Sequence, residues 1–434
     1  MDREHSVAVI GAGVVGATIA YALAREGRSV LLLDRAEPGM AGASFGNAGH
    51  LAAELVAPLP SQALLFGFWR ELFALGGPLD IPLRRVPQLL PWARRFAAAS
   101  AHQDENTSLL APLVKPAVQE MSNWLAAIGG SKLLRRNGHY EIWFGRHAEK
   151  RAAAQARAME DSGIRTQPAS PELLRMLKNP LPSYRGPHLH CRSRPRSAAS
   201  EAPSDARGLW FPNTGHVIDP LQVVRAFARA ADQHGAQFKQ AEVRALEPHP
   251  SRVSIHTADG TLSVHSVIVC AGAWAAPLLE RLGVRVPMEA VRGYHLELPN
   301  HEPVVDAPIL YSDQHVLVTP MQGRLRASSF MDFVTLDAEQ DPRKPKRLVS
   351  GLRRLGYSCD PAGPSWAGPR PILPDYLPAI GRIDNTNVFY ATGHQHLGLT
   401  LAPVTAELVA DLLAGRTPRH DLSAFDLRRF GALR

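Results

Sequence analysis

Three glycines close to the start of the chain have the spacing of a phosphate-binding turn. Gly11, Gly13 and Gly16 follow an apolar run at 6–10 and lead into an apolar-periodic segment at 14–26. In such a turn the first glycine permits a tight bend, the second lets the backbone approach a pyrophosphate, and the third lets a helix pack closely on a strand. The helix N-terminus then offers free N–H groups and a positive dipole end to the phosphate. The spacing predicts binding of a dinucleotide.

An acidic residue follows the next apolar run. Asp34 comes directly after residues 29–33, where a carboxylate can accept hydrogen bonds from ribose hydroxyls. This unit suits both NAD and FAD. In an NAD dehydrogenase further βαβ units should follow at once, but here dinucleotide-type segments return only at 270–274 (CAGAW) and 393–403 (GHQHLGLTLAP). A cofactor that both ends of the chain contact is long and extended, which favours FAD.

Histidines accompany two of the glycine-rich segments. His50 follows an Asn-Ala-Gly turn, and His394 and His396 lie within 393–403. Each is either a loop histidine or a group that faces the reacting molecule. No acid or cysteine joins them in a spacing typical of a zinc site, so we expect no metal.

The elements that must position these residues are those of an α/β protein. We predict helices at 14–26, 107–128, 147–162, 219–235 and 403–413, strands at 6–10, 29–33, 138–144, 208–212, 251–257, 262–269 and 387–391, and an antiparallel sheet over 290–334. Residues 186–207 are dense in Ser, Pro, Ala and Arg and predict a surface insertion.

The composition fits an enzyme of two interleaved domains. The chain has 434 residues, of which 45% are hydrophobic, so a large core is available and global disorder is excluded. The net charge is +8, but the basic residues are scattered without interleaved aromatic residues, so we expect no nucleic-acid partner. Cys191, Cys270 and Cys359 are far apart and indicate no disulfide framework.

Several long motifs in a fixed order resemble a known family. The chain is similar to the D-amino-acid oxidase superfamily of FAD-dependent oxidoreductases, and within it to bacterial D-amino-acid dehydrogenase small subunits and D-hydroxyproline dehydrogenases. The resemblance covers nearly the whole chain. It rests on VIGAGVVGATIAYALAREG at 9–27, DR at 34–35, ASFGNAGHLA at 43–52, VIVCAGAWA at 267–275, VRGYHLEL at 291–298, WAGPRPILPDYLPAIGR at 366–382 and GHQHLGLTLAP at 393–403.

The resemblance implies a fold of two interleaved domains. A Rossmann-like FAD-binding domain would comprise residues 1–57, 208–288 and 366–434. A substrate domain of α+β type, built on a mixed or antiparallel sheet, would comprise residues 58–207 and 289–365, with the insertion at 186–207 outside the family pattern.

The resemblance also implies which residues hold FAD. The turn residues would contact the pyrophosphate, Asp34 and Arg35 the adenosine, and the residues around 398–400 the pyrimidine side of the flavin. The full set is Gly11, Gly13, Val14, Val15, Gly16, Asp34, Arg35, Ser44, Asn47, Gly49, His50, Val243, Ala271, Gly272, Trp274, Gly398, Leu399 and Thr400. Covalent-flavin relatives carry a cysteine where this chain has Gly368, so we expect non-covalent FAD.

The candidate catalytic residues are Arg370, His50, His396 and Tyr294. In related amine oxidases the arginine of the motif at 366–371 clamps the substrate carboxylate, and a guanidinium suits that role because it donates two parallel charge-assisted bonds. His396 holds a position where some relatives carry a substrate-facing arginine. Tyr294 is a candidate pocket wall. The segment 326–333 departs from the family pattern, which leaves that edge of the substrate site undefined.

The resemblance implies a FAD-dependent dehydrogenase that oxidises a D-amino acid, D-hydroxyproline or D-proline among them, by hydride transfer to the flavin. The product would be an imine, and then a 2-oxo acid or a pyrroline. Three alternatives stay open: a glycine- or sarcosine-type oxidase that uses oxygen, a non-catalytic FAD-binding subunit of a larger dehydrogenase, and the flavin-dependent domain of an RNA-modifying enzyme, although the chain has no fused methyltransferase domain or basic, aromatic-rich extension.

The location of the enzyme depends on two segments. Residues 1–5 are short and charged, so we expect no secretory signal and a cytoplasmic protein. No apolar run is long enough to span a membrane. Residues 62–76 (QALLFGFWRELFALG) are amphipathic and indicate either a helix of the substrate domain or a peripheral patch on the inner face of the cytoplasmic membrane, where a quinone would accept the electrons.

Overall fold

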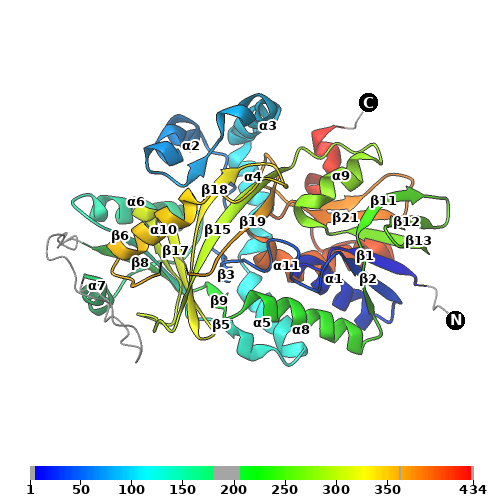
Figure 1. Ribbon diagram of the computed structural model, residues 1–434, viewed down its shortest axis with the longest axis horizontal. Helices are drawn as coiled ribbons and strands as arrows, with labels where there is room; N and C mark the ends of the chain where they lie inside the picture. Colours follow the sequence, from blue (N-terminus) through cyan, green and yellow to red (C-terminus); the bar gives the residue numbers. More distant parts are fainter. Residues whose placement is uncertain (1–4, 179–205, 361–362, 432–434) are drawn as a thin grey trace.

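Two sheets of different type occupy the two ends of the molecule. The computed structural model describes residues 5–178, 206–360 and 363–431. A mostly parallel sheet with its helices lies at one end and a large mixed sheet at the other (Figure 1). The expected insertion at 186–207 lies almost wholly outside the described residues.

The parallel sheet is assembled from distant parts of the chain. Its order is β10 (Gln237–Gln240), β2 (Val30–Asp34), β1 (Val7–Ile10), β14 (Ser266–Val269), β21 (Val388–Thr392) and β20 (Ala379–Arg382). All neighbours are parallel except β20, which pairs antiparallel with β21. Strands β1, β14 and β21 are buried along their whole length, as expected for a parallel sheet covered on both faces.

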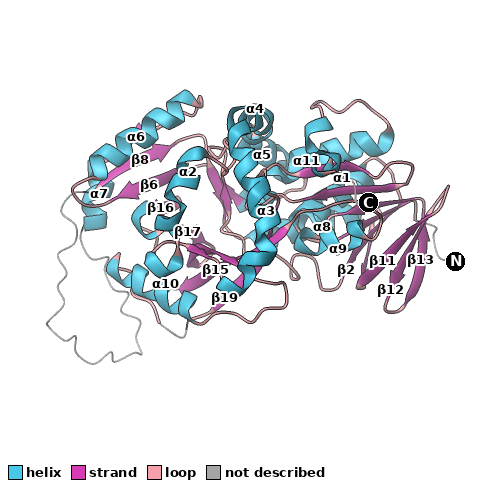
Figure 2. Cartoon of the chain, turned by 90° about the horizontal axis from the view of Figure 1, so that it is seen from above, coloured by secondary structure: helices cyan, strands magenta, loops and turns pink. Residues whose placement is uncertain are grey.

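Both faces of this sheet are covered. Val7 and Val9 of β1 join a core that includes α1 (Val14–Arg25), α8 (Pro220–Gln233) and α11 (Gly398–Ala414), whereas Ala8 and Ile10 join a second core. The second core includes the antiparallel sheet of β11 (Val243–Pro248), β12 (Val253–Thr257) and β13 (Gly260–Val264), together with α9 (Ala275–Glu280). Figure 2 shows β11–β13 at one end of the molecule and α6 (Ala148–Asp161) and α7 (Pro171–Lys178) at the other.

The mixed sheet has nine strands. Its order is β19 (Ser365–Ile372), β15 (Glu289–Pro299), β18 (Arg324–Phe333), β17 (Val316–Met321), β16 (Ile309–Tyr311), β6 (His139–Trp143), β8 (Arg207–Phe211) and β7 (Gln167–Pro168), and β4 (Leu79–Asp80) also pairs with β18. The pairs β16–β6 and β18–β4 are parallel and the others antiparallel. Helix α10 (Arg343–Arg354) packs on β15 and β18.

A small sheet and four more helices connect the two ends. The sheet pairs β3 (His50–Leu51), β9 (Gly215–Val217) and β5 (Leu134–Arg135). The helices are α2 (Gln62–Gly67), α3 (Val86–Ala99), α4 (Gln103–Val114) and α5 (Ala117–Ala127), and short 3-10 helices include η1 (Phe68–Glu71), η2 (Phe73–Leu75) and η6 (Gly272–Trp274).

Several elements differ from the prediction. The helix expected at 107–128 is two helices, because Pro116 cannot donate the backbone hydrogen bond that would continue the first. The helix expected from 403 begins at Gly398, and the amphipathic segment 62–76 is broken into short helical turns. Strands β8 and β19 pair within the nine-stranded sheet, whereas the proposed boundaries at 208 and 366 would assign them to the FAD-binding domain.

Candidate active site

A cavity of about 550 Å³ lies among the predicted cofactor residues. It lies beside the carboxyl ends of the parallel strands, which is where open α/β sheets bind ligands. Fourteen of the eighteen residues predicted to hold FAD line it: Gly11, Gly13, Val14, Val15, Asp34, Arg35, Ser44, Asn47, Val243, Ala271, Gly272, Trp274, Gly398 and Leu399. The segments around these residues come from both ends of the chain and from its middle.

The glycine turn has the close packing that its spacing predicts. Gly11 has φ +105°, and a Cβ there would lie 2.5 Å from the carbonyl oxygen of Cys270. A Cβ on Gly16 would lie 1.8 Å from the carbonyl oxygen of Gly11. The first turn of α1 therefore sits directly on the strand ends, and its Val14 N–H donates to the Ser44 hydroxyl (2.9 Å). Gly16 does not line the cavity because its role is this helix–strand contact.

The adenosine end of the cavity is built around an acid and a cation–π pair. Asp34 accepts hydrogen bonds from the N–H groups of Ala12 (2.7 Å) and Ala36 (3.2 Å). Burial raises the pKa of Asp34 despite these bonds. The guanidinium of Arg35 lies 4.0 Å from the centre of the Trp274 ring. Each Asp34 oxygen retains acceptor capacity for a ribose hydroxyl.

At the other end, α11 begins without a side-chain cap. Its 17 residues direct a positive dipole end toward the cavity at Gly398 and Leu399. Gln395, which the sequence analysis did not assign, also lines the cavity, is 4% exposed, and has no hydrogen-bond partner for either side-chain atom among the described residues. A buried amide of this kind indicates a missing ligand. The uncapped helix and the amide fit the polar edge of a flavin.

Three other predicted cofactor residues contribute to packing around the cavity instead of lining it. Gly49 has φ +74°, and its carbonyl oxygen accepts the Val217 N–H (2.7 Å). The Thr400 hydroxyl accepts the Ala52 N–H (3.1 Å). The imidazole of His50 is directed at a carboxylate. Any contact of these residues with FAD stays a prediction.

Arg370 is a half-buried cation without an acidic partner among the described residues. Its Nη1 donates to the carbonyl oxygen of Phe330 (3.0 Å), and burial lowers its pKa. Within the described part of the chain its guanidinium forms no ion pair, and the Phe330 carbonyl oxygen and Tyr376 are neighbours that favour its charged form. Arg370 lies on the face of β19 opposite to Pro369 and Pro371, which line the cavity. A charge in these surroundings favours an anionic ligand.

His396 lies between Arg370 and Glu54. Burial and the charge of Arg370 lower the pKa of its imidazole to about 4, while Glu54 opposes the shift. Its ring packs against Tyr376, with ring centroids 6.3 Å apart. The residue as a whole is nevertheless exposed, so a bound molecule can reach it. A neutral imidazole here can donate or accept one hydrogen bond to a bound molecule.

Tyr294 does not share the face of Arg370. In the β15–β19 pairing Arg370 lies opposite Val291. A Cβ on Gly293 would lie 2.1 Å from Arg370 Nη2. The side chain of Arg370 is therefore on the face of β15 that Val291 and Gly293 share. Tyr294 points to the other face, where its hydroxyl donates to Asp332 (2.8 Å) within a hydrophobic core. Side chains alternate along a strand, so Tyr294 does not face Arg370, and its role as a pocket wall stays a prediction.

The loop at 43–49 is held from the mixed sheet. Arg326 Nη1 donates to the carbonyl oxygen of Asn47 (2.6 Å), and its Nη2 pairs with Glu297 (2.5 Å). The ring of Trp366 fills the space beside Gly46, where a Cβ would lie 1.9 Å from it. Arg326 lies in the segment that departs from the family pattern. The sequence analysis missed its role because its partners are backbone carbonyls far away in the chain.

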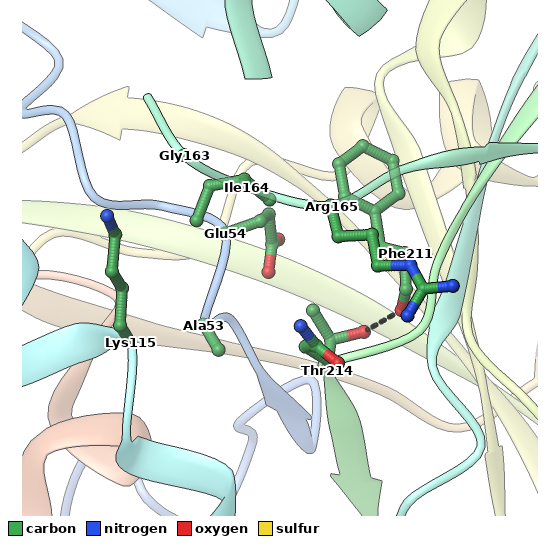
Figure 3. Close-up of a pocket in the computed structure, with 9 residues that line it drawn as sticks. Ala53, Glu54, Lys115, Gly163, Ile164, Arg165, Phe211 and Thr214 are labelled. Carbon is green, nitrogen blue, oxygen red and sulfur yellow. Dashed lines mark hydrogen bonds between the residues drawn. The ribbon is translucent and has the colours of Figure 1, made fainter. Parts of the chain in front are cut away.

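His50 belongs to a second polar cluster. Its Nε2 lies 2.9 Å from Glu54 Oε1, and His139 Nε2 lies 3.9 Å from the same oxygen. Burial opposes ionisation of Glu54, but the charges of His50 and His139 and the hydrogen bonds to the carboxylate together lower its pKa to about 2. We expected no acid to join the histidines, and Glu54 corrects that reasoning. Glu54 is also part of a pocket of about 110 Å³ that Lys115, Arg165 and Thr214 help to line (Figure 3).

Comparisons with known proteins agree with this arrangement. Residues 6–412 match the family described as FAD dependent oxidoreductase. The chain is 29% identical over 449 residues to a D-amino-acid oxidase of Bradyrhizobium diazoefficiens, covering 99% of this chain and 100% of the relative. It is 28% identical over 441 residues to a D-amino acid dehydrogenase of Paramagnetospirillum magneticum, covering 98% of each. The fold is similar to glycine oxidase from Geobacillus kaustophilus, with a TM-score of 0.70 at 23% identity over 98% of both chains. The chain therefore belongs to the DAO family of FAD-dependent oxidoreductases, and it is a flavoenzyme.

Proposed function

We propose that this enzyme is a dehydrogenase that oxidises a D-amino acid at its α-carbon. The amine becomes an imine, which water converts to a 2-oxo acid and ammonia, or a pyrroline if the substrate is cyclic. The observation that carries the proposal is Arg370, a half-buried guanidinium without an acidic partner in the described chain, which is adjacent in sequence to two prolines of the cofactor cavity. The names of the two relatives support an amino acid as the substrate.

The residues of the chain would bind and orient the substrate. Arg370 would bind the carboxylate through its free N–H groups while Nη1 remains anchored to Phe330. His396, with its pKa lowered to about 4, would stay neutral and contact the substrate without repelling its amine. FAD, when bound, supplies the hydride acceptor. The N-terminus of α11 would stabilise the negative charge that grows on the reduced cofactor.

We propose a cyclic substrate, D-hydroxyproline or D-proline, and non-covalent FAD. The segments GLWFPNTGHVIDP at 208–220 and GHQHLGLT at 393–400 support the first point, because they resemble the corresponding segments of D-hydroxyproline dehydrogenases. The second is supported by Gly368 at the position of the covalent cysteine. Cys270 does line the cavity, but burial raises the pKa of its thiol far above the ordinary value, so it is a poor nucleophile.

A quinone or another non-oxygen acceptor would take the electrons, at a peripheral membrane site. Support comes from apolar side chains exposed between α2 and α3, at the top of Figure 1: Phe66 (81%), Phe68 (47%), Trp69 (49%), Leu75 (64%), Leu83 (88%), Val86 (46%) and Leu90 (47%). Arg84 lies exposed within this stretch and suits anionic lipid, whereas Arg85 pairs with Glu289 (2.8 Å). Among the described residues no helix is long and apolar enough to cross a membrane. Oxygen is the alternative acceptor, which the name of the Bradyrhizobium relative favours.

The test is a panel of D- and L-amino acids, with the proline and hydroxyproline isomers, scored by anaerobic bleaching of the bound flavin. Bleaching by D-isomers with the cyclic ones fastest is expected, and bleaching by no amino acid would refute the function. Peroxide formed as fast as a dye is reduced would refute the proposal of a non-oxygen acceptor.

The membrane site has its own test. The double variant Phe66→Ser, Leu83→Ser should reduce binding to anionic vesicles. The control Met176→Ser, at an exposed residue (41%) on α7, should not.

A further inference from the structure

We propose that His50, Glu54 and His139 form a binding site for a divalent transition-metal ion of the zinc type. Their ligand atoms all lie within 4.8 Å of one another. Two imidazole nitrogens and a carboxylate oxygen are a ligand set that zinc uses in proteins, and zinc lies about 2.0–2.2 Å from such atoms. Two ligands of one tetrahedral ion are therefore about 3.3–3.6 Å apart. The rings would have to rotate to bring all three atoms from within 4.8 Å of one another onto one ion.

The protonation of His139 can be deduced from its hydrogen bonds. The Thr214 hydroxyl donates its only proton to the carbonyl oxygen of Phe211 (3.0 Å). Its contact with His139 Nδ1 (2.9 Å) therefore requires that Nδ1–H is the donor and Thr214 the acceptor. The neutral imidazole then carries its lone pair on Nε2, directed toward Glu54. A hydrogen bond on the far nitrogen that fixes the lone pair is the usual arrangement for a metal-binding histidine.

Two acceptors consequently face each other in a buried place. The His139 Nε2 lone pair and Glu54 Oε1 are 3.9 Å apart, with His139 2% and Glu54 7% exposed. Neither atom can donate to the other while Glu54 is ionised. A cation between them removes this repulsion and provides a partner for the carboxylate.

Unpartnered polar atoms gather around the same point. Among the described residues Glu54 Oε2 and His50 Nδ1 are buried without a hydrogen-bond partner, and so are both ring nitrogens of His216, which is 0% exposed. His216 lies directly opposite His50 in the β3–β9 pairing, so both side chains are on the same face. Buried groups of this kind call for a bound ion or water, and an ion bound by Glu54 would give its carboxylate a charged partner.

The pocket in Figure 3 provides a route to the site. Glu54 and Thr214 line it, and the exposed side chains of Lys115 and Arg165 stand at its edge (Figure 3). Their charges are screened by salt because they are exposed. The ion would join β3 and the following loop to β6 of the mixed sheet. We therefore expect a structural ion that raises Tm.

The test uses the full-length, FAD-loaded protein without a polyhistidine tag. After treatment with a chelator and its removal, the protein is titrated with Zn²⁺ against a chromophoric chelator, and bound metal is measured by mass spectrometry. We expect one equivalent per chain and a higher Tm with Zn²⁺. Glu54→Gln and His139→Gln should lose that equivalent and the Tm shift, and Thr214→Val should bind about 10- to 100-fold more weakly.

The matched control is His256→Gln, which removes an exposed histidine that lies 3.3 Å from Glu247 on the β11–β12 sheet. It should bind zinc as the wild type does. The proposal is overturned if the wild-type chain takes up no tight equivalent, if Glu54→Gln and His139→Gln retain it, or if His256→Gln loses it. Should a ligand variant fail to fold, the wild-type titration and Thr214→Val decide.

Discussion

Gly293 controls the position of the guanidinium that we assign to the substrate carboxylate. Its φ is not positive, so alanine is allowed there by the backbone. The added Cβ, however, would lie 2.1 Å from Arg370 Nη2 and 2.4 Å from Cζ, against an ordinary contact of at least 3.4 Å. In Gly293→Ala the guanidinium must therefore move by about 1.3 Å, the difference between 3.4 and 2.1 Å. Its 3.0 Å bond to the Phe330 carbonyl cannot survive that shift unchanged.

The loss of substrate affinity in Gly293→Ala can be estimated from the hydrogen bonds that the shift of Arg370 disturbs. A hydrogen bond to a charged group contributes about 1.5–3 kcal/mol. Misplacing the carboxylate clamp should therefore weaken substrate binding by about 10- to 150-fold. A displacement of about 1 Å in a positioning group can also lower turnover about 100-fold. Overpacking should cost about 1–3 kcal/mol of stability, so the protein should remain folded.

The assay is kcat/KM together with the Kd of a non-reacting carboxylate analogue, for Gly293→Ala, Arg370→Ala and the double variant. Because both changes act on the same guanidinium, the double variant should be hardly worse than Arg370→Ala. The control is Gly351→Ala in α10, where an added Cβ meets no atom within 4 Å. If Gly293→Ala bound the analogue normally, or if the two effects were additive, Arg370 would not be the carboxylate site. Loss of FAD from either variant would also contradict the assignment.

Three further predictions concern the cofactor and the pH dependence of stability. Gln395→Leu removes a buried amide without partners in the described chain, so it should stabilise the FAD-free protein and weaken FAD binding by about 5- to 150-fold; unchanged FAD affinity would show that the amide has another purpose. Trp274→Leu removes the ring that lies 4.0 Å from the Arg35 guanidinium and should weaken FAD binding by about 2- to 30-fold in a fluorescence titration, with equal affinity as the contrary result. Burial raises the pKa of Glu141 to about 7, although Ser312 donates to it. The folded state therefore holds this proton more tightly, and the resulting stabilisation, complete below about pH 4.5, is lost as the pH rises through 7. Glu141→Gln should have a higher Tm than the wild type at pH 8 and a similar Tm at pH 4, and a difference that does not depend on pH would refute the shift.

Much of the FAD-binding half could be predicted because its signals are local. The turn at 11–16 is a short motif with a direct geometric meaning, and α1 follows it as expected. Helix α8 likewise falls within the helix predicted at 219–235. The mixed sheet was less predictable. Its strands β6, β8 and β16 come from distant parts of the chain, and alternation along one strand does not reveal its neighbour.

In the candidate site, too, residues in local motifs were predictable and residues that depend on the pairing of distant strands were not. Residues in family motifs could be placed on the cavity from their position alone. Tyr294 could not, because a prediction of its face requires the register of β15 against β19. The cluster of His50, Glu54 and His139 was also inaccessible, since His139 joins it only when β6 is brought beside β3 and the loop that follows it.

The position of β1 in the parallel sheet has a consequence for biosynthesis. Strand β1 is formed by residues 7–10, yet one of its two neighbours, β14, is formed by residues 266–269. A ribosome adds about 5–20 residues per second, so β1 waits for tens of seconds before this partner is made. During that time one edge of an apolar strand has no partner, and such an edge invites pairing with other chains.

The nascent chain should therefore depend on chaperones until the middle third has been synthesised. Strands β20 and β21 arrive later still, at residues 379–392, and complete the sheet. Chains released before that point would expose the buried faces of β14 and α1. We expect truncated transcripts of this gene to yield aggregates and not a smaller flavin-binding fragment.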